Sequence, residues 1–339
     1  MDSITHLFLG GAIAAAIAPA KYRRVALLAG AVINTLPDLD VVPLALVDNP
    51  VLVMTWHRGV THSLFVLPFL AGLVWWLLKS RWQPVREAPT RWFWLILVTL
   101  LAHPLLDAFT VYGTQLFWPL ATPPEMWSSL FIIDPLFTLP LFVACVAAWM
   151  LSDKPSAQRA LAVGLLLSGS YLAWSQVAKW RVDAIAESSL AAIGLQDAPR
   201  FSTPMPFTTL LWRVVVMTPD GFMESQRSLV ADSGPMHFVK HISNADDLEQ
   251  TAAIPAVRQL NWFTHGFLKA QRDKGELVLA DLRMGAEPDY SFRFVVARDE
   301  VGGWQPIPPR QLKWPWAAGR RLPEVWYRIW QSPAAGEKR

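Results

Sequence analysis

The sequence has little of what a soluble enzyme or a secreted disulfide scaffold would need. Its single cysteine, Cys145, lies in an apolar run, so an internal disulfide is impossible, although this does not fix the compartment. Charged residues make up only 17% of the 339 residues and hydrophobic residues make up 53%, which is too apolar for an ordinary soluble protein. The net charge is only +3 and the first half has no basic stripe, so we expect no nucleic-acid partner. No cleavable signal peptide is expected at the acidic start MDSITHLFLGG.

The apolar residues are gathered into runs, several of which approach the length of about 20 residues that crosses a bilayer. Three such runs are predicted membrane spans: residues 60–78, 92–110 and 130–151. A fourth run, 160–178, is a further candidate that carries Ser168, Ser170 and Ser175. Two shorter runs, 6–20 and 24–36, are rich in Ala and Gly, so they can pack closely as half-spans, re-entrant segments or core helices. We therefore expect a mostly α, polytopic membrane bundle of about four to six helices over residues 1–180.

Basic residues lie almost entirely in the connections on one side of this bundle. The connections on that side hold nine of them: Lys21, Arg23, Arg24, Lys79, Arg81, Arg86, Arg91, Lys154 and Arg159. The opposite connections hold only Arg58. Because positive residues stay on the cytoplasmic side of a membrane, we expect the basic loops to be cytoplasmic and the opposite helix ends to be extracytoplasmic.

The chain changes character near residue 200, and a small α+β domain is predicted over residues 200–339. Strands are indicated by FSTPMPFTTLLWRVVVMTPDGF, ESQRSLVAD, MHFVKHI, ELVLADLRMG and YSFRFVVARDE. The segment AIPAVRQLNWFTHGFLKAQRDKG is predicted to form one amphipathic helix that ends at Gly275. The last stretch, 304–339, holds five Trp and seven basic against two acidic residues, which suits an anionic membrane surface or, equally, a Trp-rich packing tail. We expect this domain on the extracytoplasmic side.

Histidine and carboxylate side chains lie at the predicted extracytoplasmic ends of the helices. The set is His6, Asp38, Asp40, His57, His62, His103, Asp107 and Asp134. Ionisable groups in apolar segments are costly unless they are paired or bind an ion, so they indicate function. Imidazole and carboxylate together suit zinc, or else manganese. Eight donors exceed the needs of one tetrahedral zinc, and we expect about one to three ions.

The spacing within these motifs is compatible with ligation but leaves alternatives. His103 and Asp107 are four residues apart, so one helix face carries both, as two ligands or as a ligand and its orienting partner. The string LPDLD places two carboxylates after a proline that ends a helix, either as ligands or as solvated acids. The string HRGVTHS supplies two histidines at the entry of the third run.

Three further residues each have a second interpretation. Arg58 can grip a substrate anion such as phosphate, or it can pair with Asp38 or Asp40. His6, near the start of the chain, is a ligand or an interfacial histidine. Asp134 precedes a proline and is a ligand, a group that orients one, or the cap of the fifth helix.

Together these motifs resemble a known family. The strings LPDLD, HRGVTHS, HPLLDAFTVYGTQLFWP, FIIDPLFTLP and TPMPFTTLLWRVV resemble the bacterial inner-membrane metal-dependent hydrolases, some of them LexA-regulated, in their longer branch with a C-terminal soluble domain. The resemblance covers nearly the whole chain. It implies a hydrolase whose motif residues are His6, Asp38, Asp40, His57, His62, His103 and Asp107. A weaker similarity to zinc-dependent phospholipase C favours phosphodiesters or phospholipids as substrates.

We therefore predict a membrane-bound metal-dependent hydrolase of the bacterial inner membrane, acting on a lipid or a lipid-linked ester or phosphoester. Metal-activated water would attack, with Asp38 or Asp107 as the base and Arg58 on the anion. Two other classes stay open, namely a metal or proton transporter and a non-catalytic scaffold with a structural metal. The zinc-protease motif HExxH is absent, which ranks an intramembrane protease lower. The sequence does not indicate an oligomeric state.

Overall fold

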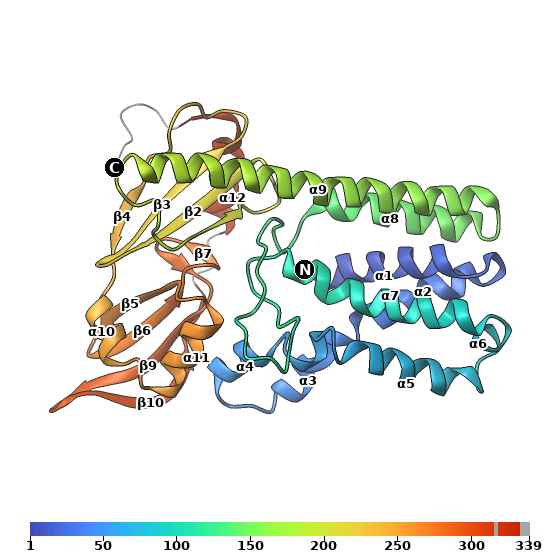
Figure 1. Cartoon of the computed structure of the whole chain (residues 1–339), viewed down its shortest axis with the longest axis horizontal. Helices are drawn as coiled ribbons and strands as arrows, with labels where there is room; N and C mark the ends of the chain where they lie inside the picture. Colours follow the sequence, from blue (N-terminus) through green and yellow to red (C-terminus); the bar gives the residue numbers. More distant parts are fainter. Residues whose placement is uncertain (315–317, 333–339) are drawn as a thin grey trace. The chain divides into compact units, whose positions relative to one another are not determined.

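The computed structural model describes residues 1–314 and 318–332 (Figure 1). The chain divides into two compact units, which are described separately. The first contains Met1–Leu44, Trp56–Trp127 and Ile132–Ser175. The second contains Ala45–Thr55, Ser128–Phe131 and the chain from Gln176 onward. Residues 315–317 and 333–339 of the predicted Trp-rich tail lie outside the described residues.

The first unit is entirely helical apart from its connections and one isolated bridge between Thr114 and Glu125, within the described residues. Its α-helices are α1 (Ser3–Ile17), α2 (Arg23–Thr35), α3 (Val41–Leu44), α5 (Leu67–Lys79), α6 (Gln83–Glu87), α7 (Pro89–Ala108), α8 (Pro135–Leu151) and the first part of α9 (Pro155–Ala191). Its 3-10 turns are η1 (Ala20–Tyr22), η2 (Pro37–Asp40) and η3 (Val60–His62). Asp2 caps α1 by accepting the N–H groups of Ile4 and Thr5.

Helices α1 and α2 pack closely because glycines face each other. A Cβ atom on Gly10 would collide with the carbonyl oxygen of Gly30 and with Asn34, and one on Gly30 would collide with the carbonyl oxygen of Gly10 and with Ala14. Small residues let helix backbones approach in this way. The Ala- and Gly-rich composition of these two runs thus predicted their close contact correctly.

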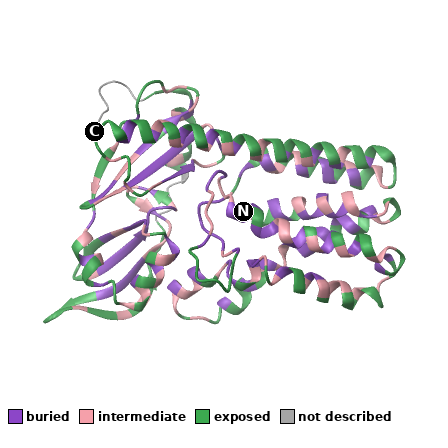
Figure 2. Ribbon diagram, in the orientation of Figure 1, coloured by how far each residue is buried: buried purple, intermediate pink, exposed green. Residues whose placement is uncertain are grey.

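Two helices, α7 and α9, are long and apolar enough to cross a membrane, and the number rises to four if each of two bent helix pairs counts as one span. The bent pairs are Ala20–Thr35 with Pro37–Leu44, and Pro50–His62 with Leu67–Lys79. The span predicted over residues 60–78 is therefore not one continuous helix. Its helix begins only at Leu67, because the chain turns between His62 and that residue. In the most apolar window α7 is 56% buried and α9 only 22%, so α9 is peripheral (Figure 2).

The second unit contains two four-stranded antiparallel sheets and a two-stranded ribbon. The first sheet has the order β1-β2-β3-β4, from β1 (Arg200–Pro204), β2 (Leu211–Thr218), β3 (Gly221–Ser228) and β4 (Val239–Ile242). The second has the order β10-β9-β6-β5, from β5 (Leu268–Asp273), β6 (Glu276–Asp281), β9 (Arg293–Glu300) and β10 (Gly303–Gln311). The ribbon joins β7 (Gly285–Ala286) to β8 (Asp289–Tyr290), and the helices are α4 (Pro50–Trp56), α10 (Ala245–Gln250), α11 (Pro255–Phe263) and α12 (Ala318–Trp330). The predicted class, a helical membrane bundle followed by a small α+β domain, is confirmed.

The helix predicted to end at Gly275 is much shorter. Helix α11 ends at Phe263, and the next residues include His265 with φ 57° and Gly266 with φ 79°, a left-handed turn that stops a helix. The chain then forms β5, which pairs with β6 through a turn in which Lys274 and Gly275 both have positive φ. Gly275 therefore belongs to a hairpin turn and not to a helix end.

Candidate metal centre

Four side chains from three segments of the first unit converge on one point. Asp38 comes from η2, His62 from η3, and His103 and Asp107 from one face of α7. Their ligand atoms all lie within 4.8 Å of one another. Because His103 and Asp107 are four residues apart on a regular helix, one element supplies half of the group. We refer to these four residues as the four-donor group.

Five of the six separations within the four-donor group match those of a tetrahedral metal site, and the sixth, between Asp38 and Asp107, is within 4.8 Å. The two Nε2 atoms of His62 and His103 lie 3.1 Å apart. Oδ1 of Asp38 lies 3.4 Å and 3.3 Å from these nitrogens, and Oδ2 of Asp107 lies 3.4 Å from each. Ligands about 2.0–2.1 Å from a tetrahedral zinc lie roughly 3.3 Å from each other. Oδ2 of Asp107 is also buried and has no hydrogen-bond partner among the described residues. The four residues therefore fit a divalent cation, and the metal's identity is not fixed by this geometry.

Both bent helix pairs break beside the four-donor group. Asp38 follows the break between Thr35 and Pro37, where the axis bends by 40°, and His62 precedes the break before Leu67, where it bends by 60°. Irregular backbone at membrane depth is tolerated where it is enclosed by protein or lines a polar cavity. Helix breaks of this kind form ion and substrate sites in other membrane proteins. The two helix breaks thus serve to position Asp38 and His62 in the four-donor group.

Thr61 fixes the ring of His62. The Thr61 hydroxyl donates to Oδ2 of Asp40 at 3.0 Å, so its oxygen is left to accept from Nδ1–H of His62, also at 3.0 Å. With the proton on Nδ1, the lone pair of His62 lies on Nε2, which faces the other donors. A neutral ring held in this tautomer is the form that binds a metal.

Asp40 and His57 form a pair beside the four-donor group. His57 donates from Nδ1 to Oδ1 of Asp40 at 2.8 Å. Oδ2 of the same carboxylate accepts from the backbone N–H of Arg58 and from Thr61. Both oxygens of Asp40 are therefore engaged by protein donors. The ring of His57 lies edge-on to that of His62, with centroids 6.0 Å apart.

Arg58 points into the site from a left-handed backbone. Its φ is 62°, which is unusual for a residue with a side chain, and strained backbone of this kind clusters at functional sites. The guanidinium lies 3.1 Å from Oδ1 of Asp107, donates to the Thr110 hydroxyl at 3.1 Å, and stacks on Tyr112 at 5.0 Å. Its carboxylate partner is thus Asp107 and not Asp38 or Asp40, the two that the sequence suggested. Thr110 and Tyr112 were not singled out from the sequence.

The structure places His6 against the four-donor group and leaves Asp134 outside it. The ring of His6 stacks on that of His103 at 3.8 Å, and Nε2 of His6 lies 3.2 Å from Oδ1 of Asp107. The amino group of Met1 contacts the same oxygen. The Asp134 carboxylate instead caps α8 through the N–H groups of Leu136 and Phe137 and accepts the Tyr171 hydroxyl at 3.0 Å.

Of the four-donor group only Asp38 is partly exposed. His6, His62, His103 and Asp107 are fully buried, whereas the side chains of Asp38 and His57 are each 23% exposed. The neighbouring residues of η2, α3 and η3 expose apolar side chains to the outside, namely Leu39, Val41, Val42 and Val60. The exposed part of Asp38 therefore has apolar neighbours along the chain.

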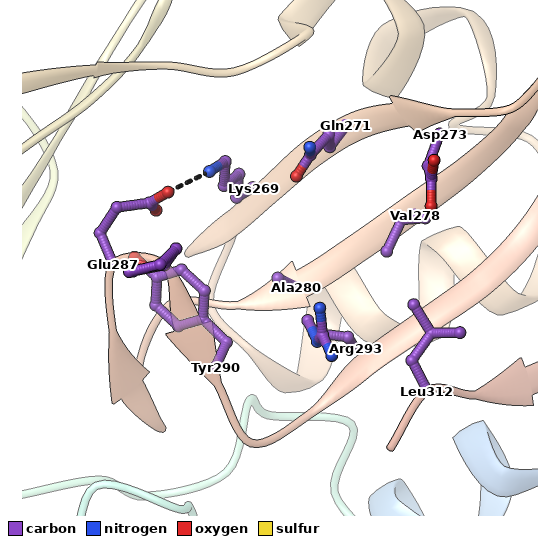
Figure 3. Close-up of a pocket in the computed structure, with 10 residues that line it drawn as sticks. Lys269, Gln271, Asp273, Val278, Ala280, Glu287, Tyr290, Arg293 and Leu312 are labelled. Carbon is purple, nitrogen blue, oxygen red and sulfur yellow. Dashed lines mark hydrogen bonds and ion pairs between the residues drawn. The ribbon is translucent and has the colours of Figure 1, made fainter. Parts of the chain in front are cut away.

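A separate hollow lies in the second unit, on the face of the β5-β6-β9 strands beside the β7-β8 ribbon (Figure 3). It encloses about 180 Å³, and the ion pair of Lys269 with Glu287, 2.7 Å long, lies at one end. This volume is below the range of about 300–1,000 Å³ that holds drug-sized ligands. We assign no function to it.

The fold and the site define a helical membrane protein with a buried His/Asp group that could hold a metal ion. The family described as YdjM inner membrane protein matches residues 1–182, and the chain belongs to this family. A relative in Bacillus subtilis (strain 168), named "Uncharacterized protein YfhP", is 31% identical over 182 residues, which are 51% of this chain and 53% of that protein. The match thus spans about half the length of that relative. No solved structure matches the chain.

Proposed function

We propose that the protein is a membrane-bound metal-dependent hydrolase that cleaves an ester or phosphoester in a lipid or a lipid-linked molecule. The observation that carries this proposal is the four-donor group, with donor separations of 3.1–3.4 Å and an unpartnered buried oxygen on Asp107. Two nitrogen and two oxygen donors favour zinc, with manganese as the alternative. This group accounts for one ion.

The neighbouring residues supply the remaining parts of a hydrolytic site. A bound divalent cation would supply Lewis acidity, which activates water and stabilises negative charge on the substrate. Asp107 and the two histidines, all buried, would hold the cation together with Asp38, whose side chain is partly exposed. The Arg58 guanidinium, planar and permanently charged, is placed to neutralise an anionic group. His57 keeps its lone pair on Nε2 because Asp40 accepts from Nδ1–H, so this ring can take up a proton.

The apolar residues next to Asp38 in the chain support a lipid substrate. In the part of the first unit that carries Asp38, Leu39 is 54%, Val41 51% and Val42 64% exposed. Apolar side chains at this density are costly in water but not against acyl chains. The asymmetry of nine basic residues against one supports an extracytoplasmic position for both the metal centre and the C-terminal domain.

Hydrolysis is tested with purified protein in lipid nanodiscs. We expect metal-dependent cleavage of a lipid phosphodiester by the natural chain and its loss in the Asp107→Asn and His62→Ala variants. Ser168→Ala is a matched control, because the Ser168 hydroxyl donates to the Phe137 carbonyl, a partner outside the four-donor group. Equal activity in the natural chain and the Asp107→Asn variant would refute the assignment.

One observation favours a second candidate, a non-catalytic scaffold with a structural metal. Four protein donors are enough to fill all positions of a tetrahedral ion, whereas catalytic zinc sites keep one position open. Cobalt substitution discriminates between the two. An absorption spectrum that responds to a soluble phosphate ester supports an open site, and a spectrum that ignores every added ester supports the scaffold.

The broken helices favour a third candidate, a metal transporter, because such breaks form ion sites in transporters. Liposomes that contain the protein and an enclosed zinc-sensitive dye test it. Zinc uptake without ester cleavage supports transport, and cleavage without uptake supports the hydrolase.

A further inference from the structure

The connection between α7 and α8 exposes a run of apolar side chains. Residues 117–123, with the sequence FWPLATP, are all exposed and none of them is charged. Leu120, near the middle of this run, is 56% exposed. A run of exposed apolar side chains is unfavourable in water, so it indicates a surface that is covered by another apolar phase or molecule. We refer to residues Phe117–Leu120 as the apolar tip.

The chain on both sides of the apolar tip is also poor in charge. After Asp107 the only charged residue up to Trp127 is Glu125, whose backbone N–H and carbonyl both pair with Thr114. Residues 59–78, which lead into and form most of α5, contain no Asp, Glu, Lys or Arg. A water-soluble protein partner is normally met by a polar rim around an apolar centre. The lack of charge here favours lipid as the occupant.

The apolar tip is held against the segment that carries His62. The backbone N–H of Leu64 donates to the carbonyl of Leu116 at 2.9 Å. The Ser63 hydroxyl donates to the carbonyl of Trp118 at 2.6 Å. Both donors lie in the 60° break between η3 and α5, where backbone groups lack helical partners. Since η3 supplies His62, the tip is fixed beside a donor of the metal centre, and all of these contacts lie within the first unit.

Helices α5 and α7 determine where the apolar tip lies along the bundle. Helix α7 is a candidate membrane span, α5 belongs to a bent pair that can form another, and Leu67 of α5 shares a buried cluster with Leu100 of α7. The contacts of Ser63 and Leu64 place the tip just before α5 begins, beside the end of α7 that carries the metal-site residues. Phe65, at the same place, is 49% exposed. Aromatic residues are enriched where a membrane protein leaves the hydrocarbon.

We propose that the apolar tip inserts into the interfacial layer of the membrane in which α5 and α7 are embedded, and that it holds the metal centre at the level of the lipid headgroups. The first part follows from the exposed, uncharged side chains of the tip and from its attachment at the ends of two candidate spans. The second part rests on the proposed function. It narrows the substrate to a membrane-resident lipid whose scissile ester or phosphoester lies at headgroup level, as opposed to an ester dissolved in water.

The position of the apolar tip is tested with spin labels on the full-length chain in phosphatidylcholine nanodiscs. Cys145→Ala removes the natural thiol, and Leu120→Cys then labels the tip. Val98→Cys, at the middle of α7, is the reference for the hydrocarbon, and Asp153→Cys, in the connection between α8 and α9, is the reference for water. All three positions are exposed, so the labels need not displace the core. Collisions with lipid-soluble oxygen are compared with collisions with a water-soluble nickel complex.

We expect the ratio of oxygen to nickel accessibility at residue 120 to be several-fold higher than at residue 153 and lower than at residue 98. A ratio at residue 120 equal to that at residue 153 would overturn the proposal, because the tip would then lie in water. A label at residue 120 that is shielded from both reagents would also overturn it, because that result means that protein covers the tip.

The substrate part is tested by comparing two phosphodiesters, a lipid in the nanodisc and a short-chain analogue dissolved in water. Leu120→Asp places a charge on the tip and should lower kcat/KM several-fold for the lipid but not for the soluble analogue, whereas Leu120→Met should change neither. An equal loss on both substrates, or no loss on the lipid, would overturn this part. If the natural chain cleaves neither substrate, the proposed function fails, and the labels still decide where the tip lies.

Discussion

The hydroxyl of Thr61 offers a sharp test of the metal centre. It contacts none of the four ligand atoms directly and acts only by orienting His62. It accepts from Nδ1 of His62 and donates to Asp40, at 3.0 Å in each case. Replacing it by Thr61→Val keeps the shape of the side chain but removes both hydrogen bonds. His62 then loses the partner that fixes its tautomer and its orientation.

The expected cost follows from the role of such partners in metal sites. Removing a group that orients a ligating histidine weakens metal binding by about 10–100-fold. This corresponds to about 1.4–2.7 kcal/mol. The assay is competition for zinc between the purified protein in detergent and a fluorescent chelator of known affinity. Thr61→Ser, which restores the hydroxyl, should recover most of the loss.

Thr138→Val is the matched control. Thr138 is a partly buried threonine whose hydroxyl donates to the Asp134 carbonyl at 2.9 Å and contacts Thr5, away from the four-donor group. Its zinc affinity should equal that of the natural chain. If Thr61→Val binds zinc as tightly as Thr138→Val while both remain folded, Thr61 does not orient His62 and the tautomer argument fails.

Three further predictions concern the rest of the molecule. Gly30→Val should lower the stability of the helical unit by about 1–3 kcal/mol because the new side chain meets the Gly10 carbonyl, and an unchanged melting temperature in detergent would argue against the close packing of α1 and α2. Hydrogen bonds from Arg272 hold the pKa of Asp247 at about 2, below its usual 3.8, so this carboxylate stabilises the second unit above pH 3.8 and stops doing so as the pH falls towards 2. The stability of the second unit, followed by near-UV circular dichroism during acid unfolding, should therefore fall less steeply between pH 3.8 and 2 in Asp247→Asn than in the natural chain. The same dependence on pH in both proteins would contradict this. In a Cys145→Ala background, a membrane-impermeant maleimide should modify Ile242→Cys but not Arg86→Cys from the extracytoplasmic side, and the reverse pattern would invert the topology.

Local rules were sufficient where one segment determines the outcome. The spacing of four predicted that His103 and Asp107 share a face of α7, and the small residues predicted that α1 and α2 approach closely. The helix expected up to Gly275 shows the limit of such rules. Its apolar periodicity continued beyond Phe263, whereas backbone preferences at His265 and Gly266 ended the helix and hairpin pairing used the following residues.

Contacts between distant segments could be anticipated as a set but not one by one. The distribution of basic residues between the two sides of the bundle predicted that Asp38, His62 and His103 share one end of the helices. Nothing local in LPDLD distinguishes Asp38 from Asp40. The 3-10 turn of η2 separates them, so that one faces the two histidines and the other faces His57. From the sequence, Asp134 could be a ligand or a helix cap. In the structure its carboxylate accepts the N–H groups at the start of α8.

The most direct measurement of the central claim is the metal content of the purified chain, combined with X-ray absorption at the metal edge. The account predicts a bound divalent ion, with nitrogen and oxygen neighbours about 2.0–2.1 Å away if it is zinc. It further predicts that His62→Ala and His103→Ala lose the ion whereas Ser168→Ala keeps it. A folded natural protein that carries no metal after purification in zinc-supplemented buffer, or one whose ion survives both histidine variants, would contradict it.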